Sequence, residues 1–206
     1  MKLKGLLMVA EADKNEFDGT RRRGLLPFFE GNNKAARYGG IGEYTLDAAL
    51  RFRIMTDLTR SGLQSKSAMQ FVVSGLGRIG SGERHFAPPR NYLATYDDQA
   101  QPPPELFIAR EIYLADWISL RGGFENDRVS VRYWAGTLEE ITRAVAFEDE
   151  EGEADNRESV SLQYYSVTRA LARVREIASD LGLPDTHQNT PDFVAESKAQ
   201  SGLEET

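Results

Sequence analysis

The chain has 206 residues, no cysteine and a net charge of −7 at neutral pH. Its length allows a sizeable core in one or two domains. The lack of cysteine excludes a disulfide framework, thiolate metal ligands and a cysteine nucleophile. No apolar run approaches the roughly 20 residues that a membrane-spanning helix needs, and we expect a cytoplasmic protein without a signal peptide and without membrane contact.

The charge is distributed unevenly along the chain. Residues 1–90 carry 15 Lys and Arg against 9 Asp and Glu, whereas the remaining residues carry 10 against 23. A basic front and an acidic back are typical of a polyanion-binding head joined to a solubilising partner domain. Accidental surface charge is the competing interpretation, since charge asymmetry alone is weakly diagnostic.

The N-terminal stretch predicts two short helices separated by a turn. Residues 3–9 have the apolar pattern of a short helix or of a strand–helix edge. Asp13 is a suitable N-cap for a second helix over residues 14–23, in which Phe17 would be the core anchor. Gly24 ends that helix.

The next stretch predicts a wing and a longer helix. Residues 28–42 contain glycine and asparagine between polar side chains, which favours a hairpin or wing over a helix. Thr45 caps a helix over residues 46–61, whose apolar positions recur at three and four residues, and Gly62 ends it. Another short helix is expected over residues 65–73.

Glycine and proline then divide the chain. The glycines of residues 74–82 predict loose chain, and proline clusters follow up to residue 104. Because polyproline cannot continue a helix or a central strand, residues 81–104 are interpreted as an interdomain linker. The linker would separate a domain of residues 1–80 from a second domain of residues 105–183, and residues 184–206 would form a disordered tail.

The second domain is expected to mix strands and helices. Residues 106–120 fit either paired strands or a buried helix, and residues 128–134 alternate as a strand does. A helix is expected from the Thr137/Glu140 capping box to about residue 147, followed by a solvated acidic loop over residues 148–155. A strand over residues 159–165 and a last helix, capped by Ser166 or Thr168 and ended by Gly182, complete the domain.

Over residues 3–73, the order of these features resembles the MerR-type winged helix-turn-helix family. The matching pieces are Gly24-Leu25-Leu26-Pro27, Tyr44-Thr45 and Ser61-Gly62-Leu63. The turn over residues 10–13 lacks the family's usual Gly-Val-Ser, and the second half does not resemble the long dimerisation helix of the family's metal sensors. The resemblance implies a winged helix-turn-helix head, so we expect an α+β fold in which this head precedes a second, acidic α/β domain.

The resemblance also implies double-stranded DNA as the partner and the helix over residues 14–23 as the recognition helix. Base edges would be met by its first turn and phosphates by its arginine triplet. The expected DNA-binding residues are Lys14, Asn15, Thr20, Arg21, Arg22 and Arg23 on the helix and Lys34, Arg37 and Tyr38 on the wing. The nearby Glu11, Glu16 and Asp18 would be repelled by phosphates unless turned away or paired, and a solvated basic face is the alternative.

An enzymatic function finds little support. His85 and His187 lie in the linker and the tail, where loops without supporting packing seldom preorganise catalysis. Residues 75–80 fit G-x-G-x-x-G, but neither a clear preceding strand nor a following helix is expected there, which favours a linker over a nucleotide site. We expect no enzyme activity, no metal and no cofactor.

The sequence therefore predicts a sequence-specific transcription regulator that acts as a homodimer on paired half-sites. A prophage or mobile element is the setting we consider. A protein–protein adaptor or assembly factor that uses the same helical head is the alternative. The aromatic side chains of the second domain are interpreted as core or as a self-association face, and they include Trp117, Tyr133, Trp134, Tyr164 and Tyr165.

Overall fold

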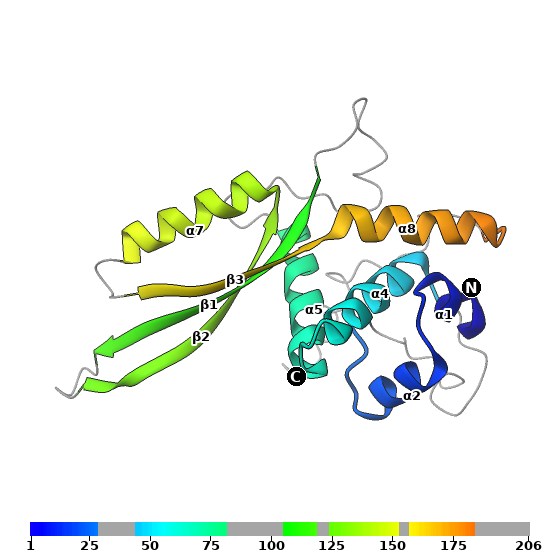
Figure 1. The fold of residues 1–206 in the computed structure, drawn as a ribbon, viewed down its shortest axis with the longest axis horizontal. Coiled ribbons are helices and arrows are strands. Elements are labelled where there is room, and N and C mark those ends of the chain that lie inside the picture. The colour runs from blue at the N-terminus through cyan, green and yellow to red at the C-terminus, as the bar shows by residue number, and fades with distance from the viewer. Residues whose placement is uncertain (29–43, 82–104, 119–123, 153–156, 184–206) are drawn as a thin grey trace, which may run out of the picture.

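The computed structural model describes residues 1–28, 44–81, 105–118, 124–152 and 157–183. Within these residues the protein is a mixture of helices and one antiparallel sheet, as an α+β fold requires (Figure 1). The elements in chain order are α1 (Leu3–Val9), α2 (Lys14–Arg22), α4 (Leu46–Arg60), α5 (Ser65–Ser81), β1 (Phe107–Ile118), β2 (Phe124–Gly136), α7 (Leu138–Gly152), β3 (Arg157–Ser166) and α8 (Val167–Asp180). We call α1, α2, α4 and α5 the head.

Helix α4 is the centre of the head. Thr45 Oγ1 accepts a hydrogen bond from the backbone N–H of Ala48 at 3.1 Å and caps its N-terminus, as predicted. Because apolar side chains lie on most of its sides, α4 is buried between its neighbours. Its largest fully buried side chains are Leu46, Leu50, Phe52 and Ile54, and α1, α5 and α8 all contact it.

The second half contains a three-stranded sheet in the order β2-β1-β3. Strand β1 pairs with β2 in a long antiparallel hairpin that points away from the head, and with β3 on its other side (Figure 1). The segment over residues 106–120, for which strand pairs and a buried helix were both considered, is therefore a strand. The β-branched and aromatic residues at positions 107, 108, 112 and 113 of β1 are those that favour strands.

Helix α5 covers one face of the sheet and continues through the glycine-rich segment to Ser81. The prediction of loose chain over residues 74–82 was therefore wrong for residues 74–81. The reason lies at Gly75, where an added Cβ would be 2.8 Å from the Cβ of Ile108 in β1. Glycine allows this close approach, and the packing outweighs its poor helix propensity.

Helix α7 covers the other face of the sheet, where its buried Ile141 packs against Ala109 of β1. The predicted capping box is confirmed, because Glu140 N–H donates to Thr137 Oγ1 at 3.2 Å and Thr137 N–H donates to Glu140 Oε2 at 2.8 Å. The helix extends to Gly152, so the acidic loop predicted from residue 148 is helical over its first part.

Helix α8 follows β3 directly and lies against α1 and α4. Ser166 Oγ accepts a hydrogen bond from the backbone N–H of Arg169 at 3.3 Å, which identifies Ser166 as the N-cap. The hydroxyl of Thr168 instead accepts a hydrogen bond from the backbone N–H of Leu106 at 2.9 Å. Gly182, with a φ of +61°, follows the end of the helix as expected.

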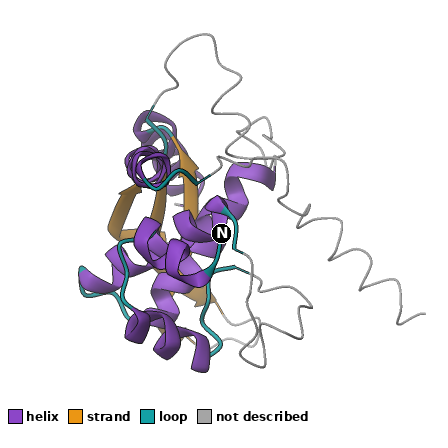
Figure 2. Cartoon of the chain, turned by 90° about the vertical axis from the view of Figure 1, so that its right-hand side faces the viewer, coloured by secondary structure: helices purple, strands orange, loops and turns teal. Residues whose placement is uncertain are grey.

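One buried cluster joins the head to the second half. It contains Phe17, Phe52 and Phe71 from the head together with Ile108 of β1 and Leu171 of α8. Viewed from the head, the strands lie behind the helices (Figure 2). The division at residues 81–104 stays a prediction, since all but Ser81 of that segment lies outside the described residues, as does the tail over 184–206. No helix in the described ranges is long and apolar enough to cross a bilayer.

Candidate nucleic-acid interface

Helix α2 is fixed at its start by a reciprocal capping box. Asp13 Oδ1 accepts a hydrogen bond from the backbone N–H of Glu16 at 2.8 Å, and Glu16 Oε2 accepts one from the backbone N–H of Asp13 at 2.9 Å. Two orphan N–H groups of the first turn are thereby satisfied. The predicted N-cap is confirmed, and the helix ends at Arg22, one residue before the predicted limit.

Aromatic contacts orient α2 on the head. The buried Phe17 ring meets Phe52 of α4 at a centroid separation of 5.4 Å and Tyr44 at 6.0 Å, both edge to face. Thr20 lies on the same inner side and is only 6% exposed. Of the expected DNA-binding residues of α2, Thr20 is thus the one whose side chain faces the interior, and it cannot reach a duplex in this arrangement.

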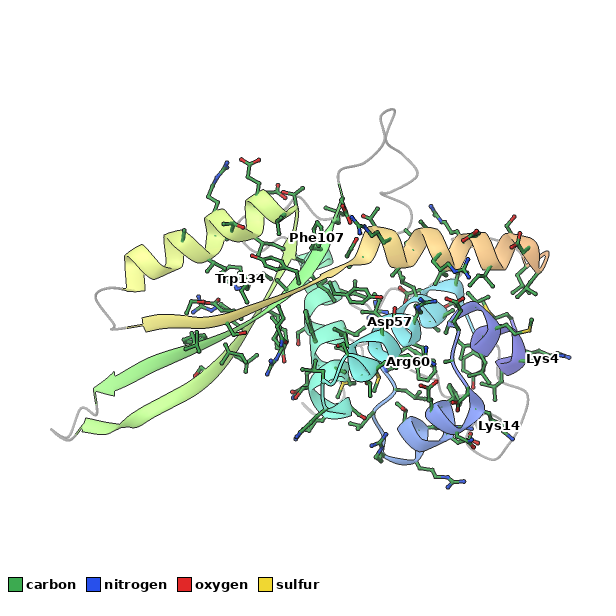
Figure 3. All side chains as sticks on the ribbon, in the orientation of Figure 1. Lys4, Lys14, Asp57, Arg60, Phe107 and Trp134 are labelled. Atoms are coloured by element: carbon green, nitrogen blue, oxygen red, sulfur yellow. The ribbon has the colours of Figure 1, made fainter. Side chains whose placement is uncertain are left out.

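The outer side of α2 carries the remaining expected residues of this helix. Lys14, Asn15, Arg22 and Arg23 are exposed and Arg21 is half-buried; Figure 3 shows Lys14 on the outside of the head. Arg23 Nε donates to the backbone oxygen of Gly19 at 3.0 Å, which holds the base of its side chain along the helix. The expected wing residues Lys34, Arg37 and Tyr38 lie outside the described residues.

Glu11, in the turn between α1 and α2, is bound by two arginines from other elements. Arg173 Nη2 of α8 donates to Glu11 Oε1 at 2.7 Å, and Arg53 Nη1 of α4 donates to Glu11 Oε2. These two hydrogen bonds lower the pKa of Glu11 to about 2, and the one from Arg173 has the larger effect. The carboxylate is therefore ionised and neutralised by its neighbours at neutral pH.

Glu16, the next carboxylate along the chain, is paired in the same way. Arg60 of α4 donates from Nη2 to Glu16 Oε2 at 3.0 Å and from Nε to Glu16 Oε1 at 3.1 Å. This bidentate pair is the planar arrangement that favours arginine over lysine. The sequence alone indicated that Glu11 and Glu16 could repel phosphates unless they were paired, and both are paired with arginines from outside α2.

A second group of polar contacts extends from Arg53 to the sheet. Arg53 Nε donates to Asp57 Oδ2 at 2.8 Å, and the hydroxyl of Tyr165 in β3 donates to the same oxygen at 2.6 Å. The pKa of Tyr165 is raised, mainly by burial and secondly by the hydrogen bond to Asp57, so the proton stays on the hydroxyl. The turn before α2 is thus connected through α4 to the last strand of the sheet.

The sequence did not reveal this network. The spacing of Arg53 and Asp57 by four residues was a visible signal, because such pairs share a helix face. The partners Arg173 and Tyr165 come from more than a hundred residues away, and no local pattern identifies them. Arg51, on the same helix as Arg53, pairs with Asp47 at 2.7 Å.

Comparisons with known proteins add no family assignment. The chain matches no protein-family model, no curated protein and no solved structure. The resemblance to MerR-type regulators therefore stays a prediction, and the predicted wing over residues 28–42, on which it partly depends, lies outside the described residues except for Phe28.

Proposed function

We propose that the chain is a sequence-specific, DNA-binding transcription regulator with a MerR-like winged-helix head, and that α2 is its recognition helix. The observation that carries the proposal is the sorting of charge around this helix. The carboxylates of Glu11 and Glu16 are engaged by arginines of α4 and α8, while Lys14 and Arg22 are exposed on the outer side. Basic side chains beside neutralised carboxylates favour contact with a polyanion.

The proposed roles follow from position along α2. Lys14 and Asn15 lie in the first turn, which recognition helices present to base edges in the major groove. Arg22 and Arg23 lie at the other end and would bind phosphates, which fixes register without reading sequence. Thr20 supports the helix from inside. On the wing, Lys34, Arg37 and Tyr38 would reach the adjacent backbone or minor groove.

The proposal includes a homodimer. One small head seldom gives sufficient affinity, whereas two heads on paired half-sites bind cooperatively through their common symmetry. The second half would supply the dimer contact. Multi-angle light scattering of the full chain should give twice the monomer mass of 23.0 kDa, and a monomer at the concentrations that bind DNA would contradict this part of the proposal.

The direct test measures binding of the full chain to labelled duplex DNA by fluorescence anisotropy over a salt series. Each phosphate contact contributes about −0.9 to the slope of log affinity against log salt concentration. We expect a steeply negative slope together with enrichment of particular sequences from a randomised duplex library. No retention of duplex at physiological salt would contradict the regulator.

A protein–protein adaptor is the second candidate. It is favoured by exposed apolar side chains on both edge strands of the sheet, Val131 of β2 at 40% exposure and Val160 of β3 at 57%. A regulator could use the same side chains for dimerisation. Failure to bind any duplex, combined with salt-insensitive capture of a partner protein, would select the adaptor instead.

A further inference from the structure

Asp18 differs from the other described carboxylates of the head. Each of the others accepts at least one hydrogen bond. The donors are Arg53 and Arg173 for Glu11, the backbone of Glu16 for Asp13, and Arg60 for Glu16. In α4 they are Arg51 for Asp47, and Arg53 and Tyr165 for Asp57. Asp18 makes no hydrogen bond or ion pair with any residue that the structure describes, although it is half-buried.

Asp18 lies between two basic residues on the outer side of α2. Lys14 and Arg22 lie one turn before and one turn after it, and steps of four residues keep all three within about 80° of the helix circumference. Phe17 and Thr20 face the buried side, about 100° and about 160° around the helix from Asp18. The strip of α2 that would enter a groove therefore has a carboxylate at its centre and a cation at each end.

A carboxylate in that place discriminates between bases. It only accepts hydrogen bonds, so it is repelled by phosphates and by the acceptor edge of guanine. Cytosine offers its N4 amino group in the major groove as a donor and has no acceptor of its own on that edge; the acceptors O6 and N7 of the pair belong to the partner guanine. Adenine also offers an amino group, but its N7 acceptor lies next to that group and disfavours a carboxylate.

We infer that Asp18 is a specificity-determining residue, which accepts a hydrogen bond from the N4 amino group of a cytosine at the base step facing the middle of α2. This inference rests on the proposed function, since it assigns a base to the proposed recognition helix. Asp18 weakens binding to DNA in general and favours sites that carry this cytosine, which is how an interface gains specificity from a repulsive element.

The test is selection from a randomised duplex library with three full-length proteins: wild type, Asp18→Asn and Asp180→Asn. Asp180, at the exposed end of α8, provides the same change of charge away from α2. An asparagine pairs with the N6 and N7 edge of adenine. We therefore expect Asp18→Asn to change one selected position from cytosine to adenine, with about tenfold change in discrimination there, and Asp180→Asn to keep the wild-type motif.

Two other outcomes are distinguishable and each overturns the inference. If Asp18→Asn selects the wild-type motif and binds every duplex more tightly by the same factor, Asp18 acts only as a general repulsive charge, and the regulator stands without it. If wild type enriches no motif, the proposed function itself fails, and the assignment of a base to Asp18 fails with it.

Discussion

Arg173 of α8 and Glu11 in the turn before α2 form an ion pair, with 2.7 Å between Arg173 Nη2 and Glu11 Oε1. Glu11 has a φ of +50°, a left-handed conformation that costs a residue with a Cβ about 1–2 kcal/mol. Because Arg53 of α4 binds the same carboxylate, two separate helices hold this turn. The start of α2 is therefore positioned partly by the C-terminal end of the fold.

Glu11→Gln should destabilise the protein, because both arginines lose their charged acceptor while the shape of the side chain is kept. The Glu11 side chain is 35% exposed, so solvent screening limits the loss to about 1–2 kcal/mol of unfolding free energy. Urea denaturation measures it. The control is Glu139→Gln, whose exposed pair with Arg143 on α7 should matter by less than about 0.5 kcal/mol. Equal stability of the two variants would contradict the role of Glu11.

The stability contributed by Glu11 should depend on acid pH. Its pKa falls from the ordinary value of 4.5 to about 2 on folding, so the unfolded state binds the extra proton first as pH decreases. The contribution is complete above about pH 4.5 and is lost as pH falls towards 2. The difference in unfolding free energy between wild type and Glu11→Gln should therefore shrink over this range. A difference that stays constant down to pH 2 would be inconsistent with the ion pairs.

Tyr165→Phe should lower the unfolding free energy by about 1 kcal/mol, because Asp57 loses a hydrogen bond in a partly buried site. The matched control is the neighbouring Tyr164→Phe. Its hydroxyl makes no hydrogen bond within the described part of the chain, and the residue is 37% exposed. Thermal unfolding of both variants measures the effect. The assignment fails if loss of the Tyr164 hydroxyl costs as much.

Gly75→Ala should destabilise the fold even though alanine is the better helix former. The new Cβ would lie 2.8 Å from the Cβ and 2.9 Å from the Cγ2 of Ile108, so α5 would be pushed from the sheet, at a cost of about 1–3 kcal/mol. Gly77→Ala is the control, since its Cβ meets nothing within 4 Å, and it should stabilise by up to about 1 kcal/mol. Stabilisation by both substitutions would show that the close approach is unimportant.

Local patterns predicted local structure well. The caps at Asp13 and Thr45 and the capping box at Thr137 are interactions between residues three apart, so the sequence contains both partners. The helix over residues 74–81 was missed because its support comes from Ile108, across the segment read as a linker. A glycine that permits close packing and a glycine that ends a helix look the same in sequence.

The sequence predicted which charged residues lie near α2, but it did not predict which of them form ion pairs. The arginine triplet and the competing carboxylates were evident, whereas the partners of Glu11 and Glu16 were not. Arg60 and Arg173 lie 44 and 162 residues from their partners. Such pairs follow from the tertiary arrangement of α4 and α8, and this arrangement decides whether an acidic neighbour cancels a basic surface.

The most direct measurement compares duplex affinity in two double variants of the full chain. Lys14→Ala with Arg22→Ala removes two exposed cations from α2, and Lys66→Ala with Arg143→Ala removes one lysine and one arginine from α5 and α7. We predict at least about tenfold weaker binding and a salt slope shallower by about 0.9 per lost phosphate contact for the α2 variant alone. Equal losses in the two variants, or none in either, would contradict α2 as the DNA-binding surface.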